Sequence, residues 1–132
     1  MAGVYVDTSA LGRVLLGEPD AEVILDALDT YDAWWSSALL VVELRRLARR
    51  EGFEEAAEHA LARTRLLDVD RAVLERGSRL DPIAVRALDA IHLDAAVVLA
   101  GRDEIDTVFT YDHQLQAGCL HHGLAVEAPV ET

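Results

Sequence analysis

Short apolar runs and longer amphipathic stretches alternate along the chain, and their spacing predicts a regular succession of strands and helices. The first run, Gly3–Val6, is rich in β-branched and aromatic residues and stops at the polar triplet 7–9, which is typical of a buried strand entering a helix. Further strands are expected at 34–35, 66–69, 107–110 and 124–126. Further helices are expected from the Pro19-Asp20 start onward and at 38–50, 53–65, 72–79 and 83–100, with a helical turn at 112–117.

Strands that alternate with helices within 132 residues predict an α/β fold in a single domain, 1–132. Because parallel neighbouring strands require a helical crossover, we expect a mainly parallel sheet. Ligand sites in such folds lie beyond the carboxyl ends of the strands. The polar residues that immediately follow each predicted strand are therefore the first candidates for function.

Composition narrows the class of protein. Hydrophobic residues make up 52% of the chain, enough for a substantial core, but the longest uncharged apolar stretch, 33–42, is far shorter than a membrane-spanning helix. The first twelve residues lack the basic and apolar segments of a signal peptide. Cys119 is the only cysteine, and with His121 and His122 it offers too few ligands for zinc. We expect a soluble, cytoplasmic protein without membrane association.

The charged residues are strongly asymmetric, with 24 acids against 12 basic residues, all of them arginine, and a net charge of −12. Since the chain has no lysine, Walker A loops, Schiff-base enzymes and phosphoreceiver domains are excluded. The net charge also disfavours a protein that coats nucleic acid by bulk attraction. It remains compatible with an acidic cleft filled by metal ions or with a basic partner.

Two acids lie where an α/β fold places its ligand site. Asp7 ends the first predicted strand, and Asp112 lies two residues beyond the strand that finishes near Thr110. Aspartate is also a favoured N-cap at a junction between strand and helix. Each residue, taken alone, therefore has a structural explanation as well as a functional one.

Two further acids, Glu43 and Asp89, interrupt apolar faces of predicted helices, with leucine or valine on the neighbouring turns. A carboxylate on a buried face costs several kcal/mol unless another group compensates it. The structural alternative for each is an ion pair with a basic residue three positions away, namely Arg46, Arg86 or His92.

Acids from separate elements converge only if a cation binds between them, since like charges repel and otherwise take up protons. Mg²⁺ and Mn²⁺ prefer oxygen ligands and retain several waters, so a few carboxylates form a site that stays open to a substrate phosphate. The sequence therefore predicts a divalent metal site built from Asp7, Glu43, Asp89 and Asp112.

Four short blocks carry a resemblance to a known family: VDTSAL at 6–11, VEL at 42–44, ALDAIHL at 87–93 and FTYD at 109–112. In this order they resemble the four blocks of PIN domains, and most closely those of the VapC toxins of bacterial type II toxin–antitoxin pairs. The resemblance spans nearly the whole chain. It implies a three-layer α/β/α sandwich with a central, mainly parallel sheet.

The resemblance also implies a function. It indicates a Mg²⁺- or Mn²⁺-dependent ribonuclease that leaves a 5′-phosphate and a 3′-hydroxyl, is inhibited by a cognate VapB antitoxin, and is usually a homodimer. Position by position, the family's acidic quartet matches Asp7, Glu43, Asp89 and Asp112. The hydroxyl positions that support the quartet match Thr8, Ser9 and Thr110.

The acidic cluster implies hydrolysis of an RNA phosphodiester by a metal-activated water. We expect Asp7 and Asp89 to bind metal directly and Glu43 to bind metal or orient the water. Asp112 is expected to bind a second or weakly held ion. The alternatives are an inactive PIN-like module that only binds metal, and another metal-dependent phosphohydrolase, although the latter usually carries an Asp-x-Asp nucleophile that this chain lacks.

Other residues near these blocks have several interpretations. Asp94 is rotated by about 140° from Asp89 on an ideal helix, so it is expected at the helix surface or in an indirect supporting role. His92 lies on a mostly apolar helix and is expected to be packed and hydrogen-bonded rather than catalytic. His113, His121 and His122 are expected at the surface.

Arginines cluster just after Glu43 on the same predicted helix, at Arg45, Arg46, Arg49 and Arg50. They are interpreted as contacts for RNA phosphates or for the antitoxin, or simply as a solvated helix face. Two adjacent tryptophans, Trp34 and Trp35, either stack on RNA bases or, more simply, form core or dimer contacts.

Overall fold

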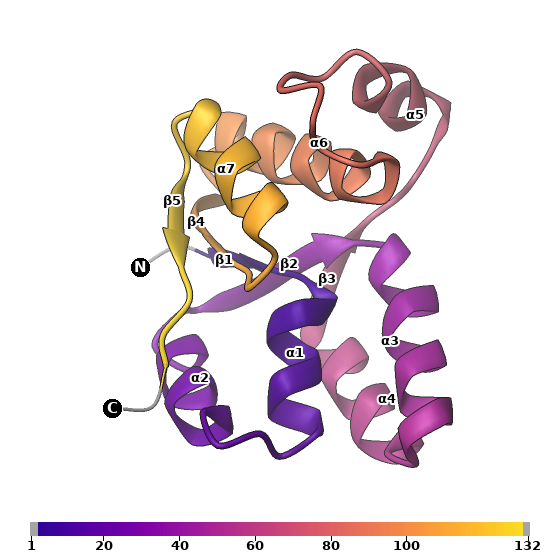
Figure 1. The fold of residues 1–132 in the computed structure, drawn as a ribbon, viewed down its shortest axis with the longest axis vertical. Coiled ribbons are helices and arrows are strands. Elements are labelled where there is room, and N and C mark those ends of the chain that lie inside the picture. The colour runs from indigo at the N-terminus through magenta and orange to yellow at the C-terminus, as the bar shows by residue number, and fades with distance from the viewer. Residues whose placement is uncertain (1–2, 131–132) are drawn as a thin grey trace.

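The computed structural model describes residues 3–130 and contains a five-stranded sheet with helices on both faces (Figure 1). The strands are β1 (Gly3–Val6), β2 (Ala33–Ser37), β3 (Thr64–Leu67), β4 (Ile105–Phe109) and β5 (Ala125–Glu127). Their order in the sheet is β3-β2-β1-β4-β5, and every neighbouring pair is parallel. The predicted α/β fold with a parallel sheet is confirmed.

Helices cover the two faces of the sheet unequally (Figure 1). One face carries α1 (Thr8–Leu15), α2 (Ala21–Leu28), α3 (Leu39–Glu51) and α4 (Glu54–Arg63). The other carries α5 (Arg71–Gly77), α6 (Ala87–Gly101) and α7 (His113–His121). None of the helices in the described part of the chain is long and apolar enough to cross a membrane.

Side-chain alternation along β1 divides the core into two layers. Val4 and Val6 pack in the cluster formed with α1 to α4, whereas Tyr5 points to the opposite face and packs in the cluster formed with α6 and α7. All three side chains have no exposed surface. A strand buried on both faces explains why the sequence shows a continuous apolar run here rather than an alternating one.

Two predicted helix boundaries differ from the structure by four residues. The helix α6 begins at Ala87 rather than at 83, because Arg86 has an extended backbone (φ −70°, ψ 162°) and Ile83 is 94% exposed. In contrast, α7 continues to His121 rather than ending at 117. Leu115 and Cys119, one turn apart, are fully buried in the second layer, and this packing extends the helix through Gly118, which is weakly helix-forming.

Asp94 is buried, whereas one of the two predictions for it is a position at the helix surface. Asp94 is only 2% exposed, so the expected surface position is wrong. Its two oxygens accept hydrogen bonds from the guanidinium of Arg76, at 3.0 and 3.1 Å. This bidentate pair ties α5 to α6, and Asp94 therefore has a structural partner away from the predicted metal ligands.

Trp34 is a core residue. It is 4% exposed, its Nε1–H donates a hydrogen bond to the carbonyl of Leu28 at 3.0 Å, and the guanidinium of Arg63 covers its ring at 3.7 Å from the centroid. Trp35 is partly buried against the second core layer. A base-stacking role for Trp34 is therefore excluded, because both the ring edge and one ring face already have partners.

Close packing at the start of β1 generates a test of the sheet arrangement. A Cβ atom added at Gly3 would lie 2.6 Å from Trp35 Cδ1 and 2.8 Å from the backbone oxygen of Glu104, whereas one added at Gly101 would meet nothing within 4 Å. We expect Gly3→Ala to lower the free energy of unfolding by about 1–3 kcal/mol because backbone and ring must move. Urea denaturation measures this, with Gly101→Ala as the control that stays equal or gains. Equal midpoints for Gly3→Ala and the wild type would contradict the packing.

Candidate active site

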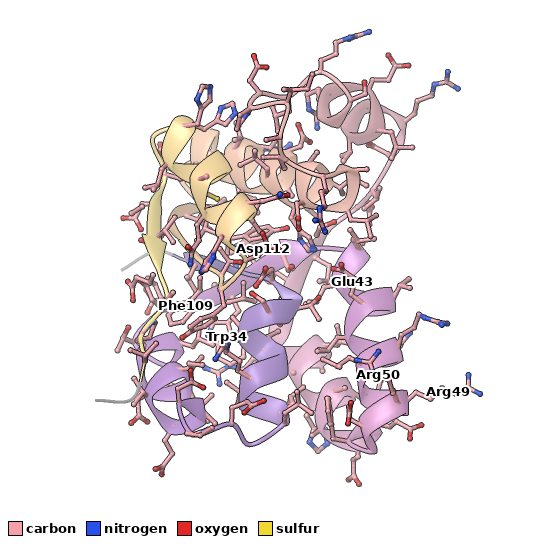
Figure 2. All side chains as sticks on the ribbon, in the orientation of Figure 1. Trp34, Glu43, Arg49, Arg50, Phe109 and Asp112 are labelled. Atoms are coloured by element: carbon pink, nitrogen blue, oxygen red, sulfur yellow. The ribbon has the colours of Figure 1, made fainter. Side chains whose placement is uncertain are left out.

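The predicted site residues gather at the carboxyl ends of three adjacent strands. Asp7 directly follows β1, Asp112 follows β4, and Glu43 lies in the second turn of α3, the helix that follows β2. Asp89 comes from the first turn of α6 in the opposite helical layer. In Figure 2, Glu43 and Asp112 lie at the level where the two helical layers meet.

Asp7 is the most enclosed of these carboxylates, at 4% exposure. Its Oδ1 accepts hydrogen bonds from the backbone N–H of Ala10 at 3.2 Å and from the Ser9 hydroxyl at 2.7 Å, and its Oδ2 accepts one from the Thr110 hydroxyl at 2.6 Å. Burial raises its pKa, and the two hydroxyls partly oppose this effect. Asp7 does cap α1, but capping accounts for only one of its three hydrogen bonds.

The hydroxyl groups of Ser9 and Thr110 join the start of α1 to the end of β4. The backbone N–H of Tyr111 donates to Ser9 Oγ at 2.8 Å, and the N–H of Asp112 donates to Thr110 Oγ1 at 3.1 Å. Each hydroxyl can then donate its own proton to Asp7. These bonds fix the position of Asp7 relative to Asp112.

Asp112 is the N-cap of α7, as its structural explanation required. Its Oδ1 accepts a hydrogen bond from the N–H of Leu115 at 2.9 Å. The described residues donate no hydrogen bond to its Oδ2. Capping and ligand binding are therefore compatible for this side chain, because they can use different oxygens.

Glu43 has a different partner from the one that the helix pattern suggested. Its Oε1 lies 2.6 Å from His92 Nε2 and accepts a hydrogen bond from the Thr8 hydroxyl at 3.1 Å, whereas Arg46, among the described residues, forms no ion pair with it. Burial raises the pKa of Glu43, but His92 and Thr8 together outweigh burial and lower it. Glu43 is thus held as a carboxylate.

The side chain of Asp89 is half-buried and forms no hydrogen bond or ion pair with any described residue, so neither Arg86 nor His92 is its partner. Burial raises its pKa most, followed by the negative charge of Asp112. The negative charges of Asp7 and Glu43 add to the shift. Asp89 is therefore the carboxylate on which the negative charges of the other three act.

The donor set fits a hard divalent cation. Among residues 3–130, no three His, Cys, Asp or Glu side chains are close enough to enclose a metal ion by themselves. Mg²⁺ and Mn²⁺ do not require such a cage, because they bind through a few carboxylates and fill their remaining positions with water. Asp89, whose oxygens lack any other partner in the described part of the chain, and Asp112, with one free oxygen, are suited to this role.

Sequence reasoning missed one functional candidate, Tyr5. It counted as an apolar strand residue, but its hydroxyl lies 2.6 Å from His92 Nδ1 and accepts a hydrogen bond from the N–H of Ser37 at 3.0 Å. The available signal was a tyrosine among valines on a fully buried strand, since a buried phenol requires hydrogen-bond partners. The expectation that His92 is packed and hydrogen-bonded is confirmed, at 2% exposure.

Comparisons with known proteins indicate the family. Residues 4–118 match the family model described as the PIN domain. Ribonuclease VapC46 of Mycobacterium tuberculosis (strain H37Rv) is 36% identical over 131 residues, covering 98% of this chain and 99% of the relative. Ribonuclease VapC47 of Mycobacterium tuberculosis (strain CDC 1551) is 32% identical over 133 residues, covering 96% of each chain.

A solved structure supports the same fold. The crystal structure of Mycobacterium tuberculosis VapC20, a sarcin–ricin loop cleaving toxin, superposes with a TM-score of 0.66 at 19% identity, covering 86% of this chain and 93% of that one. The chain belongs to the PIN domain family. Within that family its nearly full-length relatives are VapC ribonucleases, which confirms the prediction of a VapC-type ribonuclease.

The raised pKa of Asp89 predicts how its substitution affects metal-free protein. We expect Asp89→Asn to be at least as stable as the wild type at neutral pH, because the amide keeps the shape and removes repulsion. An acid whose pKa is raised by folding adds stability below its unfolded pKa and loses it as pH rises through the folded pKa. The advantage of Asp89→Asn should therefore shrink as pH falls from neutral toward about 4.

Thermal melts in EDTA across this pH range measure the difference. In a second series, Mn²⁺ at about 100 times its dissociation constant should stabilise the wild type by roughly 2.7 kcal/mol, and Asp89→Asn much less. If Asp89→Asn is clearly less stable than the wild type at neutral pH, Asp89 is a structural residue and its predicted role is wrong.

Proposed function

We propose that this chain is the endoribonuclease toxin of a toxin–antitoxin pair and cleaves RNA with Mg²⁺ or Mn²⁺ bound at Asp7, Glu43, Asp89 and Asp112. The observation that carries the proposal is the field around Asp89, a carboxylate without an ion-pair partner among the described residues, whose pKa is raised by burial and by three other carboxylates. Repulsion of this kind is relieved by a cation. Membership of the PIN family gives that cation a catalytic use.

The proposed roles follow from the oxygens that each side chain leaves available to a ligand. Within the described residues, Asp89 offers both oxygens, whereas Asp112 offers the Oδ2 that capping leaves free. Asp7 is held by Ser9 and Thr110, which orient its remaining lone pairs. When bound, the divalent ion supplies an activated water and neutralises charge that develops on the phosphate.

Glu43 is proposed to bind the ion or to orient the attacking water. Thr8 holds its Oε1, which leaves Oε2 for that purpose. The alternative of an inactive module that only binds metal is disfavoured because all four acids of the quartet are retained. The hydroxyl groups that would support the quartet are also in place: Thr8, Ser9 and Thr110.

Arginines on α3 are proposed to contact the RNA backbone near the site. Arg45 forms a bidentate pair with Glu58, at 2.9 and 2.7 Å, and Arg50 approaches Glu51 at 3.4 Å. Arg46 and Arg49 are exposed and form no ion pair within the described residues. All four line one open hollow along the helix that carries Glu43, and Figure 2 shows Arg49 and Arg50 farther along it.

The proposed protein partner is a cognate VapB-type antitoxin. The chain is proposed to be a single domain, to assemble as a homodimer and to act in the cytoplasm. The net charge of −12 favours a partner that presents arginines and places a basic group against the acidic quartet. Val42 and Leu88, which are 56% and 54% exposed, adjoin Glu43 and Asp89 in sequence. Apolar side chains in these positions suit a partner that covers the site.

RNA cleavage by the purified protein should require divalent metal. We expect excess EDTA to abolish cleavage of structured RNA, Mn²⁺ to restore it, and Asp7→Asn to lower kcat by at least about 100-fold. The chain has no lysine that could activate water in place of the metal ion, and both ring nitrogens of His92 are already hydrogen-bonded, so His92 cannot do so either. Asp26→Asn, an exposed change on α2, is the matched control and should retain full activity. Full activity in EDTA, in a preparation where Asp7→Asn is inactive, would refute the mechanism.

Removal of the unpaired arginines tests the proposed RNA contact. The double variant Arg46→Ala/Arg49→Ala should raise KM for RNA several-fold with little change in kcat. It should also reduce the dependence of log KM on log salt by about 0.7 for each phosphate that the variant no longer binds. The control variant Arg71→Ala/Arg79→Ala removes the same charge from exposed positions around α5. Unchanged RNA kinetics with weaker antitoxin binding would assign this face to the antitoxin instead.

A further inference from the structure

Two buried side chains, Tyr5 and His92, form a hydrogen-bonded network that ends at the proposed metal ligand Glu43. The hydroxyl of Tyr5 on β1 lies 2.6 Å from His92 Nδ1 on α6, and His92 Nε2 lies 2.6 Å from Glu43 Oε1 on α3. Tyr5 has no exposed surface and His92 has 2%. This hydrogen-bonded network thus connects the sheet to both helical layers at the proposed site.

The direction of these hydrogen bonds follows from their neighbours. The backbone N–H of Ser37 donates to Tyr5 Oη at 3.0 Å, so the phenol's own proton is available for His92 Nδ1. His92 then carries its proton on Nε2 and donates it to Glu43. Since both ring nitrogens are occupied, His92 has no lone pair to offer a metal ion.

Both hydrogen bonds to the Glu43 carboxylate end at the same oxygen, Oε1. His92 and Thr8 both donate to Oε1, at 2.6 and 3.1 Å, and they come from different helices. No described residue donates to Oε2. Two donors from fixed directions restrict rotation of the carboxylate, so the free oxygen keeps a defined orientation.

We propose that His92, held by Tyr5, is a positioning residue that presents Glu43 Oε2 to the metal ion or to the attacking water. The inference rests on the proposed function, because it requires Glu43 to act in the site. It goes beyond the acidic quartet and its hydroxyl supports by assigning a role to two buried residues, from β1 and α6, that do not touch the substrate. The competing explanation is a buried network that contributes to stability alone.

The experiment compares variants that alter this network with one that alters a different buried contact. Tyr5→Phe removes only the hydroxyl, and His92→Ala removes the imidazole, whereas His92→Gln retains a donor directed toward Glu43. Asp94→Asn is the matched control, because it perturbs a buried polar side chain of the same helix whose partner is Arg76. Each variant is measured for melting temperature in EDTA, for Mn²⁺ affinity by calorimetry, and for kcat and KM on RNA.

Supporting residues around metal ligands change metal affinity or activity by about 10-fold to 100-fold when mutated. We therefore expect Tyr5→Phe and His92→Ala to weaken Mn²⁺ binding and to lower kcat by about 10-fold or more, with KM for RNA within about twofold. His92→Gln should recover part of both losses. Asp94→Asn should lower the melting temperature and leave Mn²⁺ affinity unchanged. If Tyr5→Phe and His92→Gln lower only the melting temperature, as Asp94→Asn does, the network is structural and the proposal is wrong, even where His92→Ala fails to fold.

Glu43→Gln separates this inference from the function on which it rests. In that background, adding Tyr5→Phe should cause no further loss of Mn²⁺ affinity, because both changes act through one carboxylate. Additive losses would show that Tyr5 acts by another route and would overturn the proposal. If Glu43→Gln itself leaves metal affinity and cleavage intact, the proposed role of Glu43 fails. If Glu43→Gln weakens both and Tyr5→Phe changes neither, only the positioning role fails.

Discussion

Repulsion among carboxylates is the constraint on which the arrangement of this site depends. Asp7, Glu43, Asp89 and Asp112 come from separate elements, and the negative charges of the other three raise the pKa of Asp89. The protein does not neutralise them with its arginines, since the arginine salt bridges in the described residues involve other acids, such as Asp20, Glu58 and Asp94. Hydroxyls, backbone N–H groups and His92 stabilise three of the four, and Asp89 has no such partner among residues 3–130. A site left in this state gains stability when a cation binds.

The parallel sheet makes this concentration of charge possible. Because β2, β1 and β4 are adjacent and point the same way, the residues that follow them meet at one edge, where helix starts provide free N–H groups. Asp7 and Asp112 are N-cap residues, and each accepts a hydrogen bond from one such N–H group. Capping thus reduces the cost of placing two acids side by side, and the structural and functional explanations of these residues are complementary.

The arginines fall into two groups, those that pair with acids in the fold and those that remain unpaired in residues 3–130. Arg76 holds α5 to α6 through Asp94, while Arg13 binds Asp20 and lies over the ring of Tyr111 at 4.3 Å. These contacts stabilise the packing of helices, and they engage Arg76 and Arg13 with groups other than the four acids of the proposed site. Those on α3 that remain unpaired within the described residues, Arg46 and Arg49, lie on the helix that also carries Glu43. In a chain of net charge −12, such local positive charge is available for an anionic partner.

The sequence by itself determined the fold class and the family, because strand periodicity and short motifs are local properties of the chain. From the same motifs it predicted the four acids of the proposed site. It also predicted each strand to within two residues, as for β3 at Thr64–Leu67 against 66–69. Only the tertiary structure decided which side chains form hydrogen bonds with one another. Glu43 pairs with His92 instead of Arg46, Asp94 is buried against Arg76, and the hydroxyl of Tyr5 forms a hydrogen bond with His92. Such contacts join residues as far apart as 87 positions, and helical or strand spacing carries no information about them.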